Sequence, residues 1–149
     1  MDQTVFEQVW DGTLPSFPIF RSDQHGMQVV LDIYPAHPGH VLVIPREPVD
    51  KVFELEPYRY LQLFAVAQAA AQRISDVLQP LRVVHMVSGY DIPHVHLHLL
   101  PSFERGDADA NLLAVAGRSE NRASDEELAA MQARLMLPED RQQELLARL

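Results

Sequence analysis

The feature that most constrains this chain is an alternation of histidine with apolar residues near its middle. Residues 94–101 read His-Val-His-Leu-His-Leu-Leu-Pro, which places His94, His96 and His98 at every second position. Spacing of two predicts a β-strand with the three imidazoles on one face and the intervening apolar residues toward a core. Histidine titrates near neutral pH and is costly to bury without a partner. The row therefore indicates a site for acid–base, nucleophilic or metal chemistry.

Length and composition limit the classes of protein to consider. A chain of 149 residues fits one domain with a single core. A formal net charge of −9 argues against a general basic surface for nucleic-acid polymers. The absence of cysteine excludes disulfides and cysteine-based zinc sites. No apolar run approaches the roughly 20 residues of a membrane span, and the N-terminus lacks a signal-peptide pattern, so we expect a cytoplasmic protein with no membrane association.

The order of the predicted elements is strands, one long helix, then two more strands. Sequential strands joined by short turns favour an antiparallel α+β sheet. After residue 101 the composition changes to polar and small residues, followed by helical patterns. We therefore divide the chain into a domain over residues 1–105 and a C-terminal extension over 106–149, a loop and helices packed on the same domain. The expected helices are 3–10, 54–78, 124–137 and 141–149, and the expected strands are 19–21, 27–33, 40–45, 82–87 and 94–101.

Three interpretations of the histidine row follow from the residues alone. The first is structural, although three histidines in register make it the weakest. The second is a zinc or copper site, in which two imidazoles share an ion with a carboxylate such as Asp91 or Asp32. The third is covalent catalysis, in which one imidazole attacks an electrophile while its neighbours orient it or transfer protons.

The row and two further segments resemble the histidine-triad (HIT) family of nucleotide hydrolases and transferases. Residues 94–101 are similar to the family signature of three histidines alternating with apolar residues. Residues 32–45 resemble its segment of aspartate, loop, Pro-Gly-His, strand and proline. Residues 11–16 are similar to the motif that precedes its first strand. The resemblance covers about residues 4–103 and implies an antiparallel five-stranded sheet with one long helix, to which this chain adds a C-terminal helical tail.

The resemblance also implies roles for four histidines. His96 resembles the nucleophile that attacks the α-phosphorus of a nucleotide and becomes transiently nucleotidylated. His98 is expected to contact the phosphoryl oxygens or the bridging atom. His94 is expected to orient the neighbouring ring, with help from His40 across the sheet.

The nucleotide-binding residues are assigned in the same way. Asp32 resembles the carboxylate that accepts hydrogen bonds from the ribose hydroxyls. Apolar residues near it are expected to sandwich the base, namely Ile19, Val30, Leu31 and Ile33.

Two departures from the family pattern concern the phosphate contacts. Many relatives carry Gly-Gln and a small hydroxyl residue before the triad, whereas this chain has Gly89-Tyr90-Asp91. Tyr90 or backbone amides near Gly89 would have to supply the donors, and the Asp91 carboxylate is unfavourable near a phosphate unless it turns away. His85 stands where relatives usually have asparagine, so a fourth imidazole is expected to face the phosphate.

The function that the resemblance implies is hydrolysis of a nucleoside phosphoramidate or related nucleotide ester, with release of a nucleoside monophosphate. The base is expected to be a purine, adenosine above all. The alternatives are a dinucleoside polyphosphate hydrolase or phosphorylase, and a nucleotide-binding module with little turnover. We expect no metal site and no required cofactor, although Mg²⁺ could accompany a polyphosphate. We also expect a homodimer with the helix over residues 54–79 at its interface.

Overall fold

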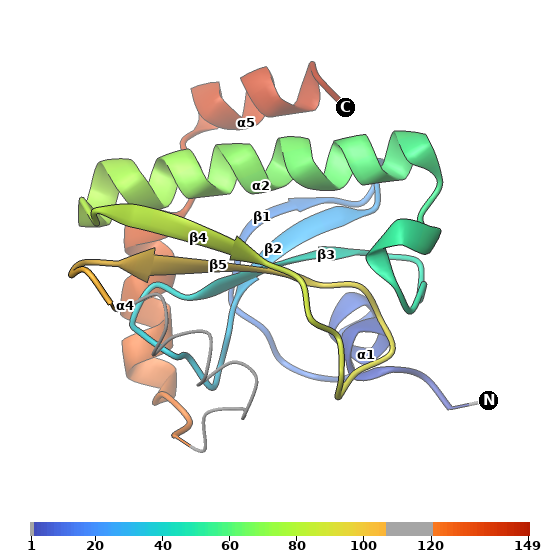
Figure 1. Ribbon diagram of the computed structural model, residues 1–149, viewed down its shortest axis with the longest axis horizontal. Helices are drawn as coiled ribbons and strands as arrows, with labels where there is room; N and C mark the ends of the chain where they lie inside the picture. Colours follow the sequence, from blue (N-terminus) through green and yellow to red (C-terminus); the bar gives the residue numbers. More distant parts are fainter. Residues whose placement is uncertain (1, 107–120) are drawn as a thin grey trace.

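A five-stranded antiparallel sheet forms the centre of the molecule (Figure 1). The computed structural model describes residues 2–106 and 121–149. The strand order is β1-β2-β3-β5-β4, which places β5 in the interior and β4 at one edge. The α+β class and the antiparallel sheet expected from the sequence are therefore confirmed. The strands are β1 (Pro18–Ser22), β2 (Met27–Leu31), β3 (Val41–Pro45), β4 (Arg82–Met86) and β5 (Leu97–Ser102).

One face of the sheet is covered by the long helix α2 (Pro57–Leu78), which follows a short 3-10 turn, η1 (Val52–Glu54). Proline at the first position of α2 costs no hydrogen bond. The main core lies between this helix and alternate residues of the strands, among them Val29, Val43 and Leu97. Helices α4 (Asp125–Leu135) and α5 (Glu139–Leu146) contact α2, and their leucines enter the same core.

In the described part of the chain, the opposite face of the sheet carries a single short helix, α1 (Val5–Asp11). Thr4 and Glu7 form a capping box at its start, and Gly12 ends it at φ 84°, in the left-handed region. A smaller apolar cluster joins α1 to the strands through Phe6, Val9, Trp10, Val30, Leu42 and Ile44. Because side chains alternate along a strand, neighbouring residues of β2 and β3 serve two different layers.

The histidine segment departs from the expected strand. The strand was expected over residues 94–101, but β5 runs from Leu97 to Ser102. Before Leu97 the backbone leaves the sheet, where the amide of Val95 donates to the carbonyl of Val49 at 2.7 Å. His94 and His96 therefore lie outside the regular ladder.

The C-terminal extension includes α4 and α5, whereas the loop expected ahead of them falls largely within residues 107–120, outside the described residues. The division at residue 105 stays a prediction. Within the described ranges, no helix combines the length and apolarity needed to cross a lipid bilayer.

Candidate active site

A cavity of about 350 Å³ opens on the α1 side of the sheet. Its walls come from α1, the chain over residues 14–16, the end of β2 with the loop that follows, β3, and residues 88–92. His40, His96, His98 and Asp32 all line it. Apolar side chains supply much of the remaining wall, namely Val5, Phe6, Val9, Leu14, Val30, Leu31, Ile33, Leu42 and Ile92. A mostly apolar cavity with a few convergent polar groups is typical of a small-ligand site.

His96 is held so that one ring nitrogen is free. Its Nδ1 lies 2.8 Å from the carbonyl oxygen of His94, and a carbonyl can only accept, so we assign the ring proton to Nδ1. The lone pair is then on Nε2. Burial lowers the pKa of His96 and outweighs the nearby carboxylate of Asp91, which raises it. The ring is therefore a neutral imidazole at pH 7, the form that acts as a nucleophile.

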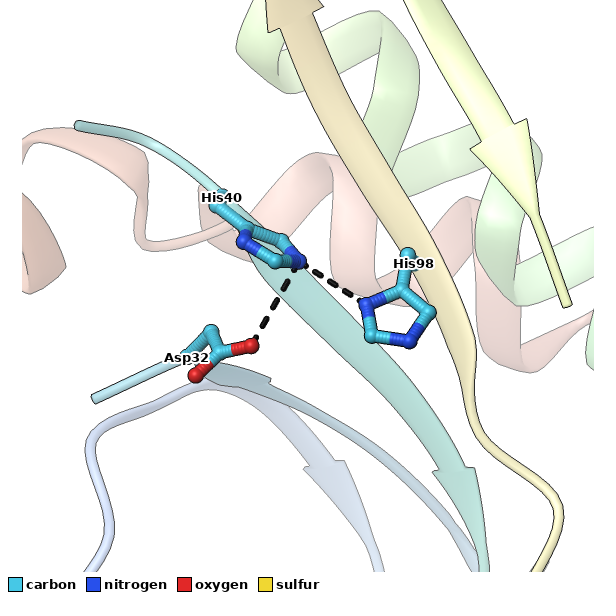
Figure 2. Close-up of side chains that lie close together, drawn as sticks. All are labelled: Asp32, His40 and His98. Atoms are coloured by element: carbon cyan, nitrogen blue, oxygen red, sulfur yellow. Dashed lines mark hydrogen bonds and ion pairs between the residues drawn. The ribbon is translucent and has the colours of Figure 1, made fainter. Parts of the chain in front are cut away.

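His98 belongs to a second chain of hydrogen bonds (Figure 2). The amide of Ala36 donates to His40 Nδ1 at 3.1 Å, so the proton of His40 lies on Nε2. The Nε2–H of His40 donates to His98 Nδ1 at 2.9 Å, and Asp32 Oδ2 lies 3.5 Å from His40 Nε2. His98 must then carry its own proton on Nε2. The backbone amide of Ala36 thus determines, through His40, that His98 presents an Nε2–H donor on the side of its ring away from His40.

The imidazole rings of His40 and His98 are both neutral. Burial, with a contribution from the neighbouring His96, lowers the pKa of His98 to about 3. Burial also holds the pKa of His40 well below its usual range, with further contributions from His98 and His96. The site thus pairs a bare nitrogen on His96 with an N–H on His98, and their ring centroids lie 4.9 Å apart.

Among the described residues, Asp32, His40 and His98 are the group whose ligand atoms lie close enough together to hold a metal ion. One ligand atom from each lies within 4.8 Å of the others. A metal ion on His40 Nε2 would move the ring proton to Nδ1, where it would face the N–H of Ala36 at 3.1 Å. Two donors would then oppose each other in a buried place, which is costly. These residues fit a shared proton better than a metal ion, and the expectation of a metal-free site stays a prediction.

His94 lies behind the cavity and joins three elements. Its Nε2 donates to the carbonyl of Pro45 at 2.8 Å, and its Nδ1 lies 2.7 Å from Thr4 Oγ1. The same Pro45 carbonyl accepts from Trp10 Nε1 at 3.2 Å. Burial lowers the pKa of His94, so Nδ1 accepts from the Thr4 hydroxyl. His94 thus links α1 to β3, and its carbonyl orients His96.

Sequence reasoning missed Thr4 and Phe6. The Phe6 ring lies against His96 with centroids 4.7 Å apart. The pattern Thr-x-x-Glu over residues 4–7 signals a helix start. The Thr4–His94 contact spans 90 positions, and no local pattern indicates it.

Most of the expected nucleotide-binding residues line the cavity, but two do not. Those that do are Val30, Leu31, Asp32, Ile33, Gly89 and Tyr90. Ile19 is instead fully buried in the main core, on the strand that α4 contacts, because the register between β1 and β2 shifts next to it. His85 pairs with Leu99, whereas Met86 pairs with His98. Opposed residues share a face of the sheet, so His85 points away from the triad and is exposed. The expectation that His85 faces the phosphate was wrong.

Known proteins resemble this chain in sequence. The HIT domain family matches residues 14–105. "Protein hit" of Bacillus subtilis (strain 168) is 27% identical over 111 residues, which cover 71% of this chain and 75% of that protein. "AP-4-A phosphorylase" of Mycobacterium tuberculosis is 30% identical over 112 residues, covering 66% of this chain and 56% of the relative.

Solved structures share the fold. A "Hit-like protein involved in cell-cycle regulation" from Bartonella henselae superposes with a TM-score of 0.76 at 18% identity, covering 91% of this chain and 96% of that one. A zinc-bound histidine triad family protein from Mycobacterium smegmatis gives a TM-score of 0.70 at 20% identity, covering 97% and 96%.

Proposed function

Because this chain belongs to the HIT domain family, whose match spans more than half of its length, we propose that it is a nucleotide hydrolase that forms a nucleotidyl-His96 intermediate. Its substrate is a nucleoside phosphoramidate or a related nucleotide ester, attacked at the α-phosphorus. The observation that carries the proposal is the hydrogen bond from His96 Nδ1 to the His94 carbonyl, because it leaves Nε2 free beside the cavity.

In the first step, His96 Nε2 attacks the α-phosphorus and the bond from phosphorus to the leaving nitrogen breaks. The leaving nitrogen takes up a proton from solvent before cleavage, so the amine departs neutral. His98 Nε2–H donates to a phosphoryl oxygen that gains charge in the transition state. The nucleotidylated imidazole is cationic, and its Nδ1–H remains on the His94 carbonyl.

In the second step, water attacks the same phosphorus and the bond to His96 Nε2 breaks. His96 leaves as a neutral imidazole, one proton of the water passes to solvent, and the nucleoside monophosphate is released. Splitting one difficult displacement into two easier ones is the advantage of a covalent intermediate. Neither step uses a metal ion.

The side chains that line the cavity support the proposal of a nucleotide substrate. Asp32 lines it and its carboxylate accepts hydrogen bonds, as ribose hydroxyls require. Val30, Leu31, Ile33 and the side chains of α1 offer an apolar sandwich for a base. We propose a purine, adenosine above all.

Mass spectrometry of the protein mixed briefly with adenosine 5′-phosphoramidate tests the covalent step, with AMP release followed in parallel. We expect a transient adduct of one AMP on the wild type and none on His96→Ala. Turnover in His96→Ala should fall by about a thousandfold or more, while AMP still binds. Near-normal turnover in that variant would sink the assignment of the nucleophile.

A second candidate is cleavage of a dinucleoside polyphosphate, by water or by phosphate. The name of the M. tuberculosis relative favours it, and Mg²⁺ would then accompany the substrate. Diadenosine tetraphosphate with and without Mg²⁺ and phosphate, compared with the phosphoramidate by kcat/KM, separates the candidates.

We also propose a homodimer formed through α2 and the free edge of β4. Leu61 on α2 and Leu81 beside β4 are 68% and 66% exposed, and burying both against a second copy would favour association. Light scattering should give twice the chain mass, and Leu61→Glu should reduce it. A monomeric wild type at micromolar concentration would contradict this proposal.

A further inference from the structure

The charge of the cavity indicates what leaves the phosphorus. Among the described residues that line it there is no lysine or arginine, whereas Asp32 and Asp91 contribute two carboxylates. The three lining histidines are neutral, because burial lowers their pKa values. A polyphosphate leaving group carries several negative charges, and nothing in the described part of this wall neutralises them. The wall suits a leaving group that is uncharged or cationic.

Asp91 is the exposed carboxylate of this cavity wall. It lines the cavity together with His96 and His98, from the loop that precedes the triad. Its carboxylate is exposed, and it forms no hydrogen bond or ion pair with another described residue. A carboxylate only accepts hydrogen bonds, so its natural partner is an N–H.

Resting on the proposed function, we propose that Asp91 selects the leaving group, by accepting hydrogen bonds from a protonated leaving nitrogen and from any further cationic group on the same amine. The substrate class is then a nucleoside phosphoramidate of a basic amine. The P–N bond cleaves when the nitrogen is protonated, because the departing group is then a neutral amine. A carboxylate beside that nitrogen favours the protonated form.

Three adenosine 5′-phosphoramidates of matched size test the proposal, with the nitrogen bearing a 2-aminoethyl, an n-propyl or a 2-carboxyethyl group. At low ionic strength we expect kcat/KM in the wild type to fall in that order, by about fivefold at each step, as for single charges partly exposed to water. Asp91→Asn keeps the shape of the side chain and should bring the three values within about twofold. Asp140→Asn, which removes the same charge from the exposed start of α5, should leave the order intact.

The possible failures are distinguishable. If all three compounds release AMP with the same order in the wild type and in Asp91→Asn, charge selection by Asp91 is overturned while the proposed function stands. Faster cleavage of diadenosine tetraphosphate with Mg²⁺ than of any phosphoramidate, lost in Asp91→Asn, would also overturn it and make Asp91 a metal-binding residue. If no substrate releases AMP and His96 forms no adduct, the proposed function itself fails.

Discussion

The two faces of the sheet use the same strands for different purposes. On one face, alternate residues of β2, β3 and β5 are apolar and fully buried under α2, which has 22 residues. On the other face, the intervening residues include His98 and Leu42, and the helix that covers them, α1, has only seven residues. Among the described residues, the short helix packs over part of this face, and the cavity opens over another part. Alternation along a strand thus lets adjacent residues carry stability and chemistry separately.

Truncating two adjacent residues, one from each face of the sheet, tests this division most strongly. Leu97 is fully buried on the α2 face and stands between His96 and His98 in the sequence. Leu97→Ala should lower the free energy of unfolding by about 2–5 kcal/mol, because it leaves a cavity in the core. His96→Ala should change that free energy far less while removing turnover. Urea denaturation and the rate of AMP release would measure both, and a large loss of kcat in folded Leu97→Ala would break the division.

Acid titration separates the faces by a smaller effect. The pKa of His98 is lowered to about 3 from an ordinary value of 6.5, so between these values the unfolded chain binds a proton that the folded chain does not. Stability is therefore full above about pH 6.5 and falls as the pH drops toward 3, by up to about 1.4 kcal/mol per pH unit from this group. His98→Asn should reduce that slope in urea denaturation at pH 6, 5 and 4.

An exposed histidine offers a matched variant. His85→Asn makes the same side-chain change at an exposed position of β4 and so controls for the substitution itself. If the free energy of unfolding of His98→Asn and of the wild type changes equally with pH, water reaches the α1 face more than its burial indicates.

The smallest predicted effect concerns the support of His96 from behind. Thr4→Val removes the hydroxyl that donates to His94, and we expect kcat to fall about five- to tenfold with little change in KM. Thr4→Ser keeps the hydroxyl and should restore most of the rate. Since Thr4 also caps α1, its loss costs about 1 kcal/mol of stability whether or not the histidine matters.

Ser124 offers a matched control, because it caps α4 with the same reciprocal pair of hydrogen bonds. Ser124→Ala should lose a similar amount of stability and keep kcat. An equal fall in kcat for both cap variants would assign the Thr4 effect to stability alone.

The sequence predicted the parts of this molecule that depend on local pattern. β-Branched residues marked β3, alanine-rich helical spacing marked α2, and the histidine row marked the site. Pairing between distant segments was not predictable in the same way. The irregular register beside Ile19 and the one-residue offset that turns His85 outward are properties of strand pairing. The tautomers of His96 and His40 depend on the backbone carbonyl of His94 and the backbone amide of Ala36. The side chains at these two positions carry no signal of those contacts.

The shared acceptor at Pro45 has an optical consequence. Trp10 is the chain's single tryptophan, and its indole N–H and the imidazole of His94 donate to one carbonyl oxygen. The guanidinium groups of Arg21 and Arg46 each lie 4.7 Å from its ring. Displacement of His94 would redistribute that carbonyl's hydrogen bonding and alter the field at the indole. We therefore expect the intrinsic fluorescence of the protein to change when His94 is displaced, without any attached dye.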